Sequence, residues 1–464
     1  MAGLHGGRSG NHSVSARCLG LALLLPVVVG SCAPPPPPEA ISIVGTSGAR
    51  VSVDSVTAAY DVNGLRVIQR PSYATDVVVA DLYFLGGVQE VTPETAGIEA
   101  LALRAAEYGT AVYPDTMSRF ALAATGSHII VEPERDWTRF GFRGVVGAFD
   151  STWVVFVDRV MHPTLEDASV ALVRSQMIRE ARAEQDSPDG AVTLLADSIA
   201  FLTHPYALRP AGNERSLAGL SPDIVRTFVA THFVDSRMLL LVVGNVSREQ
   251  VERAVTQSLA KLPRGMYQWR APLRAPVRGT SLTAVPRSFS TNYLLGLFHG
   301  PDVTSPDYPA FTIATDMLSS QLIRTVRVDR SLSYAAFATY TADALATGEI
   351  YVSTDDPSEV VPLIRDAIER RRHQWEGAAL VDRYVAFYVT RYLIENQTNE
   401  AQAASLARAA IYTGDYREAD RYMSRLRQVT SADLIRVARR YMHDIQFAYI
   451  GNRARLAGTS LRGI

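Results

Sequence analysis

The sequence predicts an α+β protein of two tandem homologous αβ domains, each with an antiparallel sheet and with helices on one face of that sheet. Three observations lead to this prediction. With 464 residues, the chain is longer than one ordinary hydrophobic core can organise. Strand patterns joined by turns precede helical patterns, which is typical of α+β domains. The chain also contains an internal repeat with a spacing of about 210 residues.

The repeat is clearest in two segments that each predict a helix followed by a strand. Residues 221–245 read SPDIVRTFVATHFVDSRMLLLVVGN, and residues 431–452 read SADLIRVARRYMHDIQFAYIGN. Both contain Ser-x-Asp, an amphipathic helical pattern, a β-rich run and Gly-Asn. A second pair of segments, VVFVDRVM at 154–161 and PLIRDAIE at 362–369, recurs at nearly the same spacing. Two matches at one spacing indicate tandem domains.

The first repeat opens with strand patterns. The segment AAYDVNGLRVIQRPS predicts a hairpin around Asn63 and Gly64, because Asn-Gly is a strong signal for a short turn. The segments DVVVADLYFLGG and RFALAATGSHIIVE predict two more strands. Residues 165–184 and 191–202 have helical spacing, so the helices are expected to follow the strands.

Composition places a boundary between the two domains. Residues 270–288 are rich in Pro, Arg and small residues, so we expect a linker between an N-terminal domain of residues 50–269 and a C-terminal domain of residues 289–464. Hydrophobic content of 47%, charged content of 20% and a net charge of -1 are typical of a globular protein. Nothing in this balance points to nucleic acid as a partner.

The N-terminus predicts export. An apolar run, CLGLALLLPVVVG, follows two arginines and has the length of the central part of a secretory signal, too short to span a bilayer comfortably. We therefore expect a signal peptide over residues 1–31. No other stretch is apolar enough to predict a transmembrane helix.

The signal ends in VGSC, which resembles a bacterial lipobox with Cys32 as the lipidated residue. The only other cysteine is Cys18, inside the signal, so the mature chain would keep a single thiol at its first position. A proline-rich linker over residues 32–49 would follow the lipid. Ala33 rather than Asp after the cysteine favours the outer membrane, facing the periplasm, by analogy with bacterial lipoproteins. The alternative is an ordinary cleavage site with an incidental cysteine.

Several segments together resemble the pitrilysin/insulinase family of zinc peptidases, the inverzincins. They are NGLRVIQRP, DLYFLGGVQE, GIEALALRAAEYGT, HPYALRPAGNERSLAGLSPDIVRTFVATHF and LLLVVGNV, in that order. The resemblance covers nearly all of residues 50–464. It implies that the two αβ domains form a clamshell around a closed chamber.

The resemblance also implies where the family's zinc motif would lie, and its residues are missing from that position. In the family, H-x-x-E-H places two histidine ligands and a glutamate base on one helix face. Aligned on the flanking glycines, the motif falls on Ala100, Leu103 and Arg104. Arginine offers no lone pair and repels a divalent cation. Since no two mature histidines lie within one helical turn of each other in the sequence, we expect no metal in this chain.

The family's third ligand is a glutamate on a downstream helix, and Glu180 in RSQMIREARAEQDSPDG falls at the matching position. We expect Glu180 to form an ion pair with Arg104, so that a salt bridge fills the volume where zinc would sit. The alternative is a carboxylate on a solvated helix face.

The second half resembles a different part of the family's active site. In TVRVDRSLSYAAFATY, Arg327 and Tyr334 match an arginine and a tyrosine seven positions apart that, in active members, bind the substrate carbonyl and the developing oxyanion. A fixed cation and a phenolic donor suit that role. The alternative is an arginine at a helix end and a tyrosine that opens a strand.

These implications favour a subunit without intrinsic catalysis, paired with a homologous H-x-x-E-H subunit that supplies zinc and acts on peptides. Whether the pair is a heterodimer or a homodimer stays open. One alternative is a metal-free peptide-binding or scaffold lipoprotein, because a peptide can add to a sheet edge without a metal. A second alternative is an active zinc metalloendopeptidase with non-standard ligands.

Overall fold

A computed structural model of the chain describes residues 57–275, 278–374 and 377–456. The expected signal peptide, Cys32 and the proline-rich linker lie outside the described residues. The described residues form one compact unit that contains both repeats. None of the helices in the described ranges is both long and apolar enough to cross a membrane.

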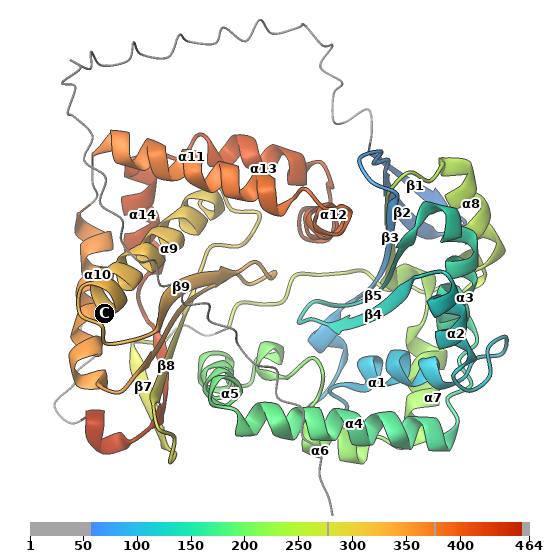
Figure 1. The fold of residues 1–464 in the computed structure, drawn as a ribbon, viewed down its shortest axis with the longest axis horizontal. Helices are drawn as coiled ribbons and strands as arrows, with labels where there is room; N and C mark the ends of the chain where they lie inside the picture. The colour runs from blue at the N-terminus through green and yellow to red at the C-terminus, as the bar shows by residue number, and fades with distance from the viewer. Residues whose placement is uncertain (1–56, 276–277, 375–376, 457–464) are drawn as a thin grey trace, which may run out of the picture. The chain divides into compact units, whose positions relative to one another are not determined.

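The first repeat forms a six-stranded sheet (Figure 1). In sheet order its strands are β1 (Ala58–Val62), β2 (Leu65–Arg70), β6 (Met238–Val243), β3 (Val77–Leu85), β5 (Trp137–Val145) and β4 (His128–Pro133). All neighbours are antiparallel except β2 and β6, which are parallel. The predicted hairpin joins β1 to β2, and both Asn63 and Gly64 have positive φ, as the tight turn requires.

The second repeat forms a five-stranded sheet with the same strand order, and within the described residues it has no counterpart of β1. In sheet order its strands are β7 (Ser281–Pro286), β11 (Gln446–Gly451), β8 (Asn292–His299), β10 (Thr347–Thr354) and β9 (Ala335–Thr341). Here too a single pair, β7 and β11, is parallel. The shared order confirms two homologous αβ halves. Strand β7 lies inside the segment expected as a linker, residues 270–288.

The helices also repeat. Those of the first half are α1 (Ile98–Ala105), α2 (Met117–Ala124), α3 (Phe149–Met161), α4 (Asp167–Asp186), α5 (Pro188–Phe201), α6 (Glu214–Gly219), α7 (Pro222–His232) and α8 (Arg248–Gln257). Those of the second half are α9 (Tyr308–Leu322), α10 (Pro357–His373), α11 (Ala378–Glu395), α12 (Asn399–Thr413), α13 (Glu418–Leu426) and α14 (Ser431–Tyr441). At a spacing of about 210 residues, α9 corresponds to α1 and α12 corresponds to α5.

One strand prediction was wrong in its first part. The segment RFALAATGSHIIVE begins within α2, and only its second part forms a strand, β4. The stretch before Gly126 is rich in alanine and leucine, which favour helices. Gly126, with φ of 63°, directly follows the end of this helix, so the segment holds a helix end and a strand start.

Each sheet packs most of its half's helices against one face, as predicted, and carries one helix from the other half on its opposite face (Figure 1). Helix α12 packs on β3 and β6 of the first sheet, and α5 packs on β8 and β11 of the second. Because α5 and α12 are equivalent in the repeat, the two halves exchange corresponding helices. This exchange joins them into a single unit.

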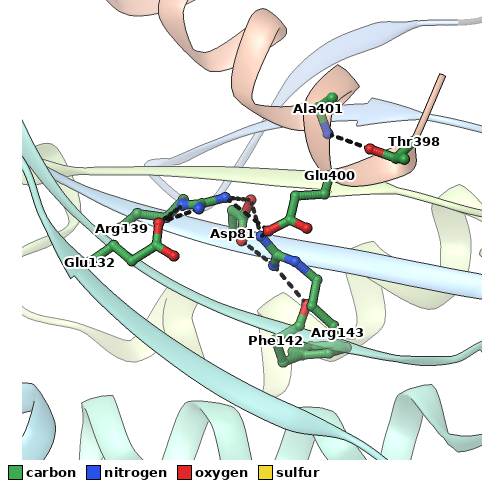
Figure 2. Close-up of polar contacts among 8 residues, drawn as sticks. All are labelled: Asp81, Glu132, Arg139, Phe142, Arg143, Thr398, Glu400 and Ala401. Carbon is green, nitrogen blue, oxygen red and sulfur yellow. Dashed lines mark hydrogen bonds and ion pairs between the residues drawn. The ribbon is translucent and has the colours of Figure 1, made fainter. Parts of the chain in front are cut away.

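A charged cluster helps to hold α12 against the first sheet, as Figure 2 shows. Asp81 on β3 is fully buried and accepts hydrogen bonds from Arg143 at 2.5 and 3.2 Å. Arg143 also donates to Glu400 of α12 at 2.7 Å. A buried carboxylate is tolerated only when it is paired in this way. The cluster therefore ties two segments distant in sequence through one arginine.

Candidate functional site

Helix α1, where the resemblance places the zinc motif, is built into the hydrophobic core of the first half. Its N-cap, Gly97, has φ of 90°, and a Cβ there would lie 2.6 Å from the carbonyl oxygen of Ala211. Only glycine fits such a backbone without strain. The helix that follows buries Ala100 and Leu103, which are 1% and 0% exposed. These two positions supply packing.

Arg104, the third motif position, lies on the partly exposed side of α1 and faces α4. Its Nη1 donates to Oε2 of Glu180 at 2.7 Å. The structure thus places these two side chains against each other. Glu180 is 61% exposed and Arg104 is 30% exposed, so water screens much of the attraction.

The pair belongs to a row of alternating charges that sequence reasoning missed. Glu180 and Glu184 lie one helical turn apart on α4, and Arg209 contacts Glu184. Glu180 also acts electrostatically on Arg209. The i,i+4 spacing of the two glutamates was a sequence signal for such a row. Arg209 could not be placed beside them from the sequence, because it comes from the loop before α6.

The residues at this site do not fit a zinc ion. A zinc site needs three or four nitrogen, sulfur or oxygen ligands around one point. Ala100 and Leu103 offer none, Arg104 offers a positive charge, and Glu180 is already paired. Across the described ranges, no group of three or more His, Cys, Asp or Glu residues could hold a metal.

A second charged pair lies at the start of α1 and is also new. Glu99 is 7% exposed, and its Oε2 lies 3.1 Å from Nη2 of Arg237. Burial raises the pKa of Glu99, and Arg237 opposes that rise. Arg237 also donates to the carbonyl oxygen of Leu85 at the end of β3. The pair therefore links α1 to the sheet and has a structural role.

The segment that carries Arg327 and Tyr334 has a very different character. Helix α9 runs into a π-helical turn over Ile323–Val328, a rare backbone form that occurs often at functional sites. Ser331 then adopts φ of 55°, which is unusual for a residue other than glycine. Arg327 is exposed and Tyr334 is 92% exposed, directly before β9. Among the described residues, neither side chain has a hydrogen bond or ion pair.

The structure brings Arg104 and Glu180 together. No hydrogen bond or ion pair within the described part of the chain joins this pair to Arg327 or Tyr334. Tyr334 stands instead beside an open sheet edge, because β9 is the last strand of its sheet. The first sheet ends in an equivalent open edge at β4.

Comparison with sequence families and curated proteins identifies relatives. Residues 219–385 match the domain family described as Peptidase M16 inactive domain. Human mitochondrial cytochrome b-c1 complex subunit 1 is 22% identical over 261 residues, which are 55% of this chain and 54% of that protein. A probable mitochondrial-processing peptidase subunit beta of Arabidopsis thaliana is 20% identical over 261 residues, 56% of this chain and 49% of the relative. The chain spans about half the length of these two relatives.

The match to a third relative extends over a larger share of both chains. The probable mitochondrial-processing peptidase subunit beta of Schizosaccharomyces pombe is 21% identical over 343 residues, 70% of this chain and 75% of the relative.

Solved structures share the fold. A peptidase M16 inactive domain from Pseudomonas fluorescens has a TM-score of 0.77 at 18% identity, covering 85% of this chain and 97% of its own. A protease from Helicobacter pylori has a TM-score of 0.79 at 17% identity, with 85% and 99% covered. The periplasmic protease PqqL from Escherichia coli has a TM-score of 0.72 at 14% identity, with 88% and 49% covered. These structures share the two-halved fold, and residues 219–385 match the Peptidase M16 inactive domain. The comparisons therefore confirm the resemblance to insulinase-like M16 peptidases that the sequence indicated.

Proposed function

We propose that this chain is a catalytically silent subunit that completes the peptide-binding chamber of a homologous zinc peptidase. The partner would supply the H-x-x-E-H helix and its zinc. This chain would supply Arg327 and Tyr334. The observation that carries the proposal is the free, 92% exposed side chain of Tyr334 beside the π-helical turn that bears Arg327.

The chemistry of the two side chains supports this assignment. A guanidinium keeps its charge at working pH, and a phenol donates a hydrogen bond without taking up a proton. Such groups stabilise an oxyanion that forms in the transition state. An oxyanion donor has no catalytic use without a nucleophile, and α1 of this chain provides none. The two exposed groups therefore suit a reaction centre that another subunit completes.

A second candidate function is peptide binding without catalysis. The open edge of β9 follows Tyr334 directly, and an extended peptide could add to it as a further strand. Main-chain hydrogen bonds would provide affinity, and no metal is needed. In this case the chain would be a scaffold or carrier for peptides.

The proposal extends to location. Export with a lipid on Cys32 would anchor the subunit to a bacterial membrane, with the outer membrane facing the periplasm as the expected site. The periplasmic protease PqqL shares the fold, which makes a periplasmic setting reasonable for this family. Mass spectrometry of the N-terminal peptide from a membrane fraction would test the lipid.

The decisive experiment measures zinc content and peptide hydrolysis of the purified full chain, alone and mixed with the nearest H-x-x-E-H homologue from the same genome. We expect no hydrolysis by this chain alone and zinc-dependent hydrolysis by the mixture. Changing Tyr334→Phe or Arg327→Ala should lower kcat of the mixture by about 100-fold to 1,000-fold, the usual effect of losing one oxyanion donor.

Controls separate the two functions. Tyr73→Phe is the matched control, since it removes the hydroxyl of another exposed tyrosine, 76% exposed, and should leave kcat unchanged. Peptide binding by the lone chain, with no gain of hydrolysis in the mixture, would favour the scaffold function. Hydrolysis or stoichiometric zinc in the lone chain would contradict both and favour a peptidase with non-standard ligands.

A further inference from the structure

Helix α12 carries a charged residue that the contact between the two halves does not use. The side chain of Arg408 lines a cavity of about 130 Å³ enclosed by residues of α9, α11, α12, α13 and β9. Arg408 is exposed to this space, although its helix is packed between the first sheet and α13. Neither Arg327, Tyr334 nor any residue of α1 lines the cavity.

Arg408 lacks a partner where its neighbours have one. Arg143 pairs with Glu400, Arg70 pairs with Asp420 at 2.5 Å, and Arg391 pairs with Asp316 at 2.6 Å. Within the ranges that the structure describes, Arg408 has no ion pair and no hydrogen bond. Its guanidinium is exposed and has donors that no described residue uses, so it can bind an anion that enters the cavity.

The walls of the cavity are mainly tyrosine rings whose hydroxyls are already engaged. Tyr412 donates to the buried Asp136 at 2.7 Å, and Tyr422 donates to Oγ1 of Thr312 at 3.1 Å. The hydroxyl of Tyr340 is 2.7 Å from that of another tyrosine. These residues therefore present ring surface to the cavity. Arg408 presents a charge there that forms no ion pair with any described residue, although Asp343 acts on it electrostatically.

The other charged groups of the lining restrict the ligand. Glu418 and Arg425 also face the cavity, and they pair with each other at 3.0 Å. Glu418 would repel a dianion such as phosphate more strongly than a single carboxylate, whose one charge Arg408 can offset. A planar guanidinium binds a carboxylate through two parallel hydrogen bonds. Aromatic rings pack well against Tyr308 and its neighbours.

We propose that this cavity binds a small monocarboxylate with an aromatic or similarly compact apolar body. The carboxylate lies on Arg408, and the apolar body lies between the tyrosine rings. The volume suits this class, since a cavity of about 150 Å³ holds benzene. A free aromatic acid and the C-terminal residue of a peptide share this chemistry. The site is independent of the role proposed for Arg327 and Tyr334.

Isothermal titration of the purified full chain tests the site. The probes are phenylacetate, benzoate, the neutral analogue benzamide, and a short peptide ending in phenylalanine with a free or an amidated C-terminus. We expect saturable binding of at least one carboxylate and none of its neutral counterpart. If only the free-ended peptide binds, the source is a peptide terminus; if only the small acids bind, it is a free acid.

Variants assign the binding to Arg408. Arg408→Met should weaken binding by at least about tenfold. Arg408→Lys should weaken it less, because lysine keeps the charge but cannot donate the two parallel hydrogen bonds of a guanidinium. Arg383→Met, an exposed arginine on α11, is the matched control and should bind as the wild type does. Since Arg408 is unpaired, its replacement should not impair folding. Equal binding of acid and amide, wild-type affinity in Arg408→Met, or no saturable binding of any carboxylate would overturn the proposal.

Discussion

Helices α1 and α9 occupy the same place in the two repeats and are both buried, yet the segments next to them differ. Helix α1 begins at a glycine locked against another loop, buries its motif positions in the core and leaves only a screened ion pair outside. Helix α9 is buried as well, but it continues into a π-helical turn, a left-handed serine and two exposed polar side chains. The same helix position in the repeat thus packs in the core in one half, and in the other half it leads into a segment with exposed polar side chains.

The comparison separates stability from function within a single architecture. Positions on α1 should respond to mutation through the free energy of unfolding. Positions between α9 and β9 should respond through binding or catalysis with little change in stability.

The largest effect is expected in the buried part of α1. Leu103→Ala should lower the free energy of unfolding by about 3–5 kcal/mol, because it leaves a cavity in a core where Leu103 is fully buried. Val328→Ala, in the exposed π-helical turn and 68% exposed, should change it by less than about 0.5 kcal/mol. Chemical denaturation of both variants measures the difference. Similar losses in the two would show that the segment after α9 is as tightly packed as α1.

The next contrast concerns two glycines with positive φ. Gly97→Ala should destabilise the protein by about 2–3 kcal/mol, because the new Cβ meets a backbone oxygen as well as an unfavourable φ. Gly414, at the end of α12, has φ of 78° and open space around it. Gly414→Ala should therefore cost only about 1 kcal/mol, the backbone term alone. Thermal unfolding would show equal shifts if close packing at Gly97 were unimportant.

A pH-dependent effect is expected where the loops of the two edge hairpins meet. Burial raises the pKa of Asp343 from 3.8 to about 6, while Arg135, at 3.4 Å, opposes the rise. The folded state then holds its proton more tightly than the unfolded chain does. The stability that this group contributes is complete below about pH 4. It is lost as the pH rises through about 6, by about 3 kcal/mol.

Asp343→Asn should remove that loss. Denaturation from pH 4 to pH 7 should give a flatter curve for the variant than for the wild type. Asp302→Asn is the control, because its carboxylate is 42% exposed and pairs with an exposed arginine. Parallel curves for wild type and Asp343→Asn would contradict the assignment to this carboxylate.

The sequence predicted the repeat and the fold class, because these depend on local periodicity and on spacing. It did not predict the exchange of α5 and α12. That exchange depends on contacts such as the hydrogen bond from Tyr412 to Asp136, whose partners are 276 residues apart. No local pattern encodes such a pairing. The π-helical turn was missed for a similar reason, since its sequence, IRTVRV, reads as an ordinary helix end.

The site itself was predictable only where a motif fixed the register. Arg104 and Glu180 could be paired before the structure because the resemblance placed both of them at one metal site. Arg408 belongs to no motif that could have placed it. Its cavity forms from five elements that meet only in the folded chain. A lone arginine on an alanine-rich helix gives no sign of which groups will surround it.

The smallest effect is expected from the ion pair at the former motif position. A double-mutant cycle with Arg104→Met and Glu180→Gln should give a coupling of about 0.5 kcal/mol that fades in high salt, because both side chains are partly exposed. A coupling above about 1.5 kcal/mol would mean that the pair holds α1 to α4. With the small coupling that we expect, the ion pair contributes little to the free energy of unfolding. It still disfavours a metal cation, since Arg104 places positive charge at the site. Arg104→Met should leave zinc affinity undetectable by equilibrium dialysis, because Ala100 and Leu103 supply no ligand in its place.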